Sequence, residues 1–217
     1  MSRSIESELL SGFPWLAHGF GTRTSPPPEL PLALVKQVHS ARAVTAWHEG
    51  NHGEADAIVT GTSGLAVGVK TADCVPILLI DAQNRAIAAI HAGWRGTVGQ
   101  IVAETLRLMK TSYGTQPQDV AASIGPGIGK CCFEVGPEVA RQFAPWYPEF
   151  SSTDQKHHVD LAEVNRRELV RAGVPASQID VSRLCTVDDR DLLFSYRRER
   201  EAAGRMLSWV AVRSPQQ

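Results

Sequence analysis

The chain has 217 residues, with 22 Lys and Arg against 23 Asp and Glu, a formal net charge of −1 and a pI near 6.7. This length suits one domain with a sizeable core, and we expect a single domain over residues 1–217. Because the charge is balanced, the chain lacks the basic field that holds nucleic acid non-specifically, so a small-molecule substrate is expected instead.

Strands are predicted through the first half of the chain. A proline-rich segment, TSPPPELP (24–31), precedes them and predicts an extended surface loop. Short segments rich in Val, Ile and Ala then predict strands at 33–39, 56–60, 65–70, 76–81 and 86–91. The last two are almost continuously apolar, which indicates a sheet that is buried on both faces and covered by helices.

The second half alternates helical and extended patterns. Apolar residues from Val98 to Met109 recur at helical spacing and predict a long helix that ends at about Gly114, with residues 93–96 as the turn leading into it. Beyond it we expect a strand at 120–125, helices at 137–144 and 161–173, and a closing strand at 205–213. This order of elements predicts an α/β fold.

The chain is expected to be cytoplasmic, with no membrane partner. Its first 16 residues lack an uninterrupted apolar stretch, and no run approaches the roughly 20 apolar residues that cross a bilayer. The four cysteines are therefore expected to be thiols, ligands or nucleophiles rather than disulfides. Cys131 and Cys132 are neighbours and are expected to be structural thiols, with a redox or site role as the alternative.

Three residues stand in short motifs that suit them to hold one metal ion. They are His39 in KQVHS, Cys74 in TADCVPILL and His91 in HAGWRG. Two histidines and one cysteine leave the fourth position of a zinc ion for water or substrate, which is how catalytic zinc sites are built. Copper is the alternative metal, because two His and one Cys also form blue-copper sites. The triplet therefore predicts an enzyme.

The residues around this triplet have candidate roles of their own. Asp73, next to Cys74, is expected either to orient a ligand or move protons, or to act only as a turn acid. The remaining histidines stand among polar or unpatterned residues, so the surface is expected for His18, His48, His52, His157 and His158.

Five motifs carry a resemblance to a known family. The segments QVHS, TADCVPILLID, AAIHAGWRGTVGQI, SIGPGIGKCCFEVG and LCTVDDRDLLFSYRRE resemble the YfiH, or laccase-domain, family of polyphenol-oxidoreductase-like proteins. The resemblance implies a compact α/β fold of layered mixed β-sheets flanked by helices, with zinc on His39, Cys74 and His91. It also implies phosphorolysis of adenosine, inosine and methylthioadenosine, together with deamination of adenosine.

These reactions suggest roles for further residues. Phosphorolysis needs a phosphate site, for which Arg95 at the start of the long helix is the leading candidate. Further candidates are Arg197, Arg198 and Arg23, although TSPPPEL follows Arg23 where the family has glycine-rich sequence. Deamination needs an activated water and a nearby carboxylate, for which Asp73 is the candidate, beside Cys74 and His91. Gly127 stands where the family often has cysteine, which weakens a redox role for the neighbouring thiols.

Two other functions stay open. A copper-dependent polyphenol oxidase, or laccase, needs many histidine ligands, and this chain has seven histidines, most of them outside plausible sites. A hydrolase that uses Cys74 as nucleophile and a histidine as base, acting on cell-wall nucleotide precursors, is the other alternative.

Overall fold

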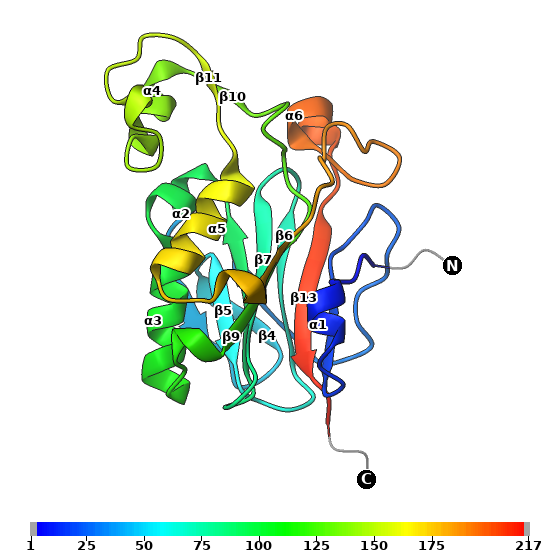
Figure 1. Cartoon of the computed structure of the whole chain (residues 1–217). Helices are drawn as coiled ribbons and strands as arrows, with labels where there is room; N and C mark the ends of the chain where they lie inside the picture. The colour runs from blue at the N-terminus through cyan, green and yellow to red at the C-terminus, as the bar shows by residue number, and fades with distance from the viewer. Residues whose placement is uncertain (1–3, 215–217) are drawn as a thin grey trace.

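The protein consists of two mixed β-sheets stacked on each other, with helices over the outer face of the larger one (Figure 1). The computed structural model describes residues 4–214. The larger sheet has the order β12-β9-β7-β8-β5-β3, with bounds Ile179–Val181, Val120–Ile124, Val75–Asp81, Ala86–Ala92, Ala57–Thr60 and Ala43–Thr45. The smaller has the order β1-β13-β6-β2-β4, with bounds Leu16–Gly19, Met206–Val212, Ala66–Thr71, Leu32–Lys36 and Gly50–Glu54.

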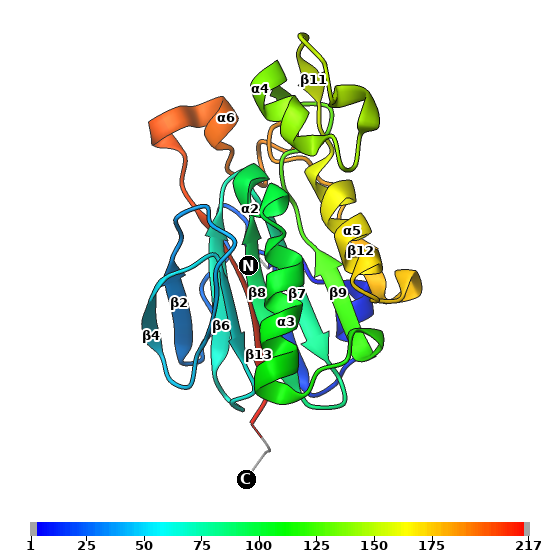
Figure 2. The same cartoon turned by 90° about the vertical axis from the view of Figure 1, so that its left-hand side faces the viewer.

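Short helices and a two-stranded pair complete the chain. The helices are α1 (Glu8–Ser11), α2 (Trp94–Val98), α3 (Ile101–Tyr113), α4 (Pro137–Ala140), α5 (Leu161–Arg171) and α6 (Tyr196–Glu199). Single 3₁₀ turns cover Pro117–Asp119, Arg141–Phe143, Pro148–Phe150, Ala176–Gln178 and Arg200–Ala202. The pair is formed by β10 (Glu134–Val135) and β11 (His157–His158), and it lies with α4 and α6 at one end of the molecule (Figures 1 and 2). Within residues 4–214, no helix is long and apolar enough to span a membrane.

The continuous apolar strands serve two cores. Side chains alternate across a strand, so Ile77 and Leu79 of β7 face α3 and α5, whereas Leu78 and Ile80 face the smaller sheet. All four are fully buried, and each contributes about 1.5–3 kcal/mol of hydrophobic stabilisation. Helices α3 and α5 cover the outer face of the larger sheet in Figure 2.

The α/β class with layered mixed sheets is confirmed, with one difference in the covering layers. Helices were expected on the buried sheet. Helices α3 and α5 cover one face, but the other face is covered by the smaller sheet together with the short helix α1. An apolar run indicates burial on both faces without specifying what buries them.

The predicted long helix is interrupted at its beginning. Residues 94–98 form the separate helix α2 rather than part of a turn, and Gln100 then takes a left-handed φ of 63° before α3 begins at Ile101. The predicted end is confirmed, since Gly114 caps α3 with a φ of 77°. The helix expected at 137–144 is α4 followed by a 3₁₀ turn.

Surface positions were predicted correctly for His48 and His158, and His52 and His157 are half-buried. The same expectation was wrong for His18, which is buried in β1 and accepts a hydrogen bond from the Ser7 N–H at Nε2, 3.0 Å away. A buried ring nitrogen with a backbone donor is satisfied without solvent.

Candidate functional site

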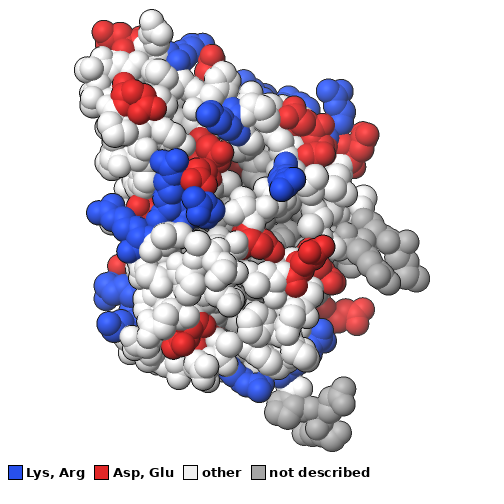
Figure 3. Space-filling model, viewed as in Figure 1, with Lys and Arg blue, Asp and Glu red and all other residues white. Residues whose placement is uncertain are grey.

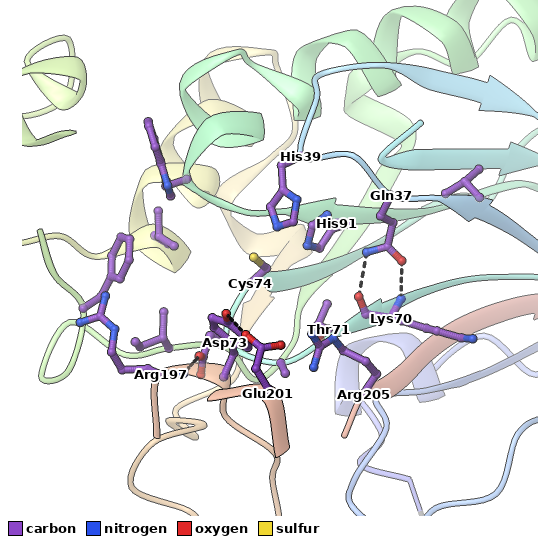
Figure 4. Close-up of a pocket in the computed structure, with 17 residues that line it drawn as sticks. Gln37, His39, Lys70, Thr71, Asp73, Cys74, His91, Arg197, Glu201 and Arg205 are labelled. Carbon is purple, nitrogen blue, oxygen red and sulfur yellow. Dashed lines mark hydrogen bonds between the residues drawn. The ribbon is translucent and has the colours of Figure 1, made fainter. Parts of the chain in front are cut away.

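The three predicted metal ligands converge at one end of the sheets (Figure 4). His39 lies in the loop after β2, Cys74 directly precedes β7, and His91 lies in β8, which pairs with β7. One ligand atom from each side chain lies within 4.8 Å of the other two. The two imidazole rings meet edge to face, with centroids 4.8 Å apart. Segments far apart in sequence thus form one three-ligand group.

A fully buried carboxylate, Asp56, holds this group in place. Its Oδ1 accepts hydrogen bonds from His91 Nδ1 at 2.8 Å and from the His39 N–H at 3.0 Å. Its Oδ2 accepts from Ser40 N at 2.6 Å, from Ser40 Oγ at 2.7 Å and from Val38 N at 3.3 Å. These bonds fix the loop in which His39 takes a left-handed φ of 58°. A carboxylate on the far nitrogen of a histidine is the usual partner of a metal-binding imidazole.

Sequence reasoning missed Asp56 as a site residue. It was included only as the first residue of the predicted strand at 56–60. The available signal was an acidic side chain directly before a fully apolar strand, because a buried carboxylate requires partners.

Electrostatics in the group favour a negative sulfur. Burial opposes ionisation of the Cys74 thiol, but hydrogen bonds with His39 and His91 outweigh it and lower the pKa of Cys74 to about 7. Burial also opposes charge on His91, but hydrogen bonds with Asp56 and Cys74 raise its pKa to about 9. For Asp56, burial is outweighed by hydrogen bonds from His91 and Ser40, and its pKa falls to about 2. Thiolate is the form of cysteine that binds a metal.

Space beside the ligands depends on a glycine. A Cβ at Gly93 would lie 2.8 Å from Cys74 Sγ and 3.3 Å from His39 Cδ2. The φ of Gly93 is −73°, so glycine is needed here for room rather than for backbone conformation. The donor types, their convergence and the carboxylate behind His91 together fit a bound metal ion.

A cavity of about 760 Å³ opens over the three ligands, within the size range of small-molecule sites. Its wall includes the aromatic side chains Trp94, Phe133 and Tyr196 and the cationic side chains Lys70, Arg197 and Arg205, and its acidic members are Asp73 and Glu201. On the face of the molecule seen in Figure 3, acidic and basic groups are interspersed. The cavity therefore offers flat apolar surfaces and positive charge close to the metal ligands.

Asp73 lines the cavity, and both its carboxylate oxygens are engaged. Oδ1 accepts from Thr186 Oγ1 and Oδ2 from the Arg197 N–H, each at 2.6 Å. Its own backbone has a left-handed φ of 91°. The side chain thus ties the residue before Cys74 to the 186 loop and to α6.

The four predicted phosphate-binding arginines lie in different places. Among residues 4–214, the cavity lining includes Arg197 and leaves out Arg23, Arg95 and Arg198. Arg198 donates to the carbonyl oxygens of residues 186, 187 and 193, and Arg23 donates to those of residues 190 and 193. Both also pair with Glu199. Arg95 is exposed, with its guanidinium carbon 4.3 Å from the centre of the Trp94 ring.

Three charged wall residues were not singled out from the sequence. They are Lys70, at the end of β6, and Glu201 and Arg205, which follow α6. The Gln37 amide exchanges two hydrogen bonds with the Lys70 backbone, at 2.7 and 2.8 Å, and so joins the wall to the His39 loop (Figure 4). Isolated charges of this kind carry no sequence signal, because only the fold brings them to one cavity.

Residues 22–213 match the family described as multi-copper polyphenol oxidoreductase laccase. The chain belongs to this family. Its relatives include a purine nucleoside phosphorylase of Bacteroides thetaiotaomicron, 44% identical over 163 residues that cover 72% of this chain and 60% of that protein. Another is the purine nucleoside phosphorylase YlmD of Geobacillus stearothermophilus, 36% identical over 82% of this chain and 71% of that one. An adenosine deaminase from an unknown prokaryotic organism is 40% identical over 71% of this chain and 61% of its own length.

Solved structures of the family share the fold. The crystal structure of YlmD from Geobacillus stearothermophilus has a TM-score of 0.86 at 27% identity, covering 96% of this chain and 94% of that one. The structure of the hypothetical protein YfiH from Bacillus licheniformis has a TM-score of 0.82 at 27% identity, over 91% and 93% of the two chains. The resemblance noted in the sequence is therefore confirmed. The names of the three relatives, two phosphorylases and one deaminase, are names of enzymes.

Proposed function

We propose that the protein is a zinc-dependent purine nucleoside enzyme, with residues 1–217 acting as one domain. It catalyses phosphorolysis of adenosine, inosine and methylthioadenosine to the free base and the ribose 1-phosphate, and it also deaminates adenosine. The observation that carries this proposal is that a His–Cys–His ligand set faces aromatic and cationic side chains within one cavity. The names of the relatives support the same chemistry.

Zinc would be held by His39, Cys74 and His91, and when bound it would supply Lewis acidity without redox chemistry. Copper is the alternative metal. A multi-copper oxidase, however, needs several histidine-rich centres. Within residues 4–214, the two groupings suited to a metal are this one and a cluster of three cysteines and an aspartate, so the histidines form only one centre. The ligand set therefore favours nucleoside chemistry over phenol oxidation.

The wall of the cavity matches the parts of the substrates. Trp94, Phe133 and Tyr196 offer faces on which a purine stacks, and Lys70 and Arg197 offer positive charge to phosphate. In phosphorolysis a phosphate oxygen forms the new bond to C1′ while the bond from C1′ to the purine nitrogen breaks. The purine leaves with the electron pair and takes up a proton, so the site needs an acid.

We assign the proton transfers to the two carboxylates of the wall, Asp73 and Glu201. Asp73 adjoins Cys74, and releasing Thr186 or Arg197 would free one of its oxygens. Glu201 is exposed to the cavity and accepts a hydrogen bond from the Tyr196 hydroxyl at 2.8 Å. In deamination, water adds at C6 of adenosine and ammonia leaves, which also requires a carboxylate to relay protons. The rates of phosphorolysis and deamination in the variants Asp73→Asn and Glu201→Gln show which carboxylate serves which reaction.

One assay tests the proposal. Protein loaded with zinc and freed of copper is incubated with adenosine, with and without phosphate, and adenine, inosine and hypoxanthine are separated. We expect adenine only when phosphate is present and inosine in both reactions. A copper-loaded sample of the same batch is compared on adenosine and on a phenol. A fast reaction with phenols by the copper form, with no nucleoside reaction by the zinc form, would show that the protein is an oxidase.

A second candidate function is a cysteine hydrolase. The low pKa of Cys74 and its two histidine neighbours would also suit a nucleophilic thiolate. Such an enzyme would hydrolyse cell-wall nucleotide precursors after complete removal of metal. Activity that disappears with the metal and returns with zinc favours the nucleoside enzyme.

A further inference from the structure

A second cluster of metal-binding side chains lies in a hollow separate from the candidate active site. It consists of Cys131, Cys132, Cys185 and Asp188, and its four ligand atoms all lie within 4.8 Å of one another. Three of these residues line a hollow of about 530 Å³, whose wall shares Ile128 with the active-site cavity and otherwise consists of different residues. The nucleoside reactions make no use of this cluster.

The spacing of the ligand atoms fits one tetrahedral ion. Cys131 Sγ lies 3.6 Å from Cys185 Sγ and 3.1 Å from Asp188 Oδ2, and Cys132 Sγ lies 3.4 Å from Asp188 Oδ1. With zinc–sulfur bonds of about 2.3 Å, a tetrahedron places its sulfur ligands about 3.8 Å apart. A disulfide between Cys131 and Cys185 would leave the other two ligands without a role.

We propose that Cys131, Cys132, Cys185 and Asp188 bind a structural zinc ion. Four protein ligands close the coordination shell, and sulfur-rich tetrahedral sets favour zinc among divalent ions. On binding, the three thiols release their protons to solvent and the carboxylate is already ionised.

In the metal-free cluster, hydrogen bonding with Asp188 raises the pKa of Cys131 and burial raises the pKa of Cys132, so a bound ion has to displace both protons. One backbone donor suits a charged sulfur. The Gly129 N–H donates to Cys185 Sγ at 3.3 Å, and hydrogen bonds of this kind stabilise a thiolate. A Cβ at Gly129 would lie 3.1 Å from Cys131 Sγ, so the turn must pass close to the sulfurs. Three thiolates and one carboxylate exceed the charge of zinc by two. The bases of the same hollow, Lys130, Arg166 and Arg183, are matched by three further acids, Asp160, Glu163 and Asp189, so the wall leaves this excess in place.

Zinc in this cluster would strengthen one wall of the active-site cavity. The segment with Cys131 and Cys132 also supplies Phe133 to that cavity, and the segment with Cys185 also supplies the Thr186 hydroxyl to Asp73. Protein contacts already join the two segments, since the Thr186 N–H donates to the residue 127 carbonyl at 3.0 Å. The ion would add a cross-link between them.

The test uses the full chain, reduced, loaded with Zn²⁺ without oxygen and freed of excess metal. Elemental analysis should find about two zinc ions per chain, and about one in the double variant Cys131→Ser/Asp188→Asn. His39→Ala should lose the other ion. Asp191→Asn is the matched control, because Asp191 is an exposed acid in the same loop and outside the cluster, and it should keep both.

Cobalt substitution gives an independent measurement. The ultraviolet thiolate-to-cobalt absorbance grows with the number of bound sulfurs, three in this cluster and one at Cys74. We expect about three quarters of the wild-type absorbance in His39→Ala and about one quarter in the double variant. The altered side chains of the double variant are exposed, and circular dichroism checks its folding. If it fails to fold, Cys131→Ser alone is measured with cobalt, and its absorbance should fall below that of wild type; an unchanged absorbance would count against the proposal.

Equal metal content in wild type and the cluster variants would overturn the proposal. So would reduced wild-type protein that binds only the ion lost in His39→Ala. Neither measurement depends on nucleoside turnover. A negative result for the zinc cluster is therefore distinguishable from a negative result for the proposed reaction.

Discussion

Asp56→Asn is the substitution that best tests how the metal ligands are held. Asparagine keeps the shape of the side chain but replaces one accepting oxygen with an NH₂ group. Oδ1 of Asp56 accepts from His39 and His91, and Oδ2 accepts from Val38 and Ser40. In either orientation, the amide nitrogen therefore faces at least two donors.

The size of the effect follows from these contacts. Each buried donor left without an acceptor costs about 1–3 kcal/mol, so with two such donors we expect the free energy of unfolding to fall by about 2–6 kcal/mol. Losing the carboxylate behind His91 should also weaken zinc binding by about 10- to 100-fold. Metal affinity should thus change together with stability.

Asp81→Asn is the matched control. Asp81 is also fully buried, and its carboxylate accepts from Gln83 and Asn84 at the other end of β7. Urea unfolding measures the stability of both variants, and competition with a chromophoric chelator measures their zinc affinity. We expect both to be destabilised and only Asp56→Asn to lose zinc affinity. Unchanged affinity in folded Asp56→Asn, or equal losses in the two variants, would refute the reasoning.

Three further predictions concern the cavity and the smaller sheet. Gly93→Ala should weaken zinc binding in the chelator assay, because the new Cβ would lie 2.8 Å from Cys74 Sγ; unchanged binding would show that the ligands have room to move. Arg197→Ala should lower the rate of phosphorolysis by about 10- to 100-fold and by more than Arg95→Ala does, because Arg197 lines the cavity; the reverse order in product assays would assign phosphate to Arg95. Burial lowers the pKa of His18 below 6.5, despite the nearby carboxylates of Glu6 and Asp180. Near pH 6.5 the unfolded chain therefore binds more protons than the folded chain does. The contribution of His18 to stability is therefore complete above pH 6.5 and is lost as the pH falls, and unfolding curves of His18→Gln between pH 7 and 5 should show a smaller loss than wild type.

The sequence by itself determined the parts of this protein that depend on local pattern. The strands β5 to β8 could be predicted because their apolar residues stand in short runs between turn residues. The end of α3 was predicted from Gly114, which takes the left-handed conformation that glycine allows. Likewise, His39, Cys74 and His91 could be grouped because each motif is specific, and the structure brings their ligand atoms together.

Only the tertiary structure decided which layers cover the larger sheet and which polar groups meet at the site. The apolar run around Ile77 and Leu78 predicts that both side chains are buried. What packs against each face depends on where distant segments of the chain lie in the fold. Asp56 likewise became a site residue because the His39 loop folds over it, and Lys70 shares a wall with Arg197 through the same long-range packing. Contacts between residues far apart in sequence leave no local pattern, because their geometry is set by the whole chain.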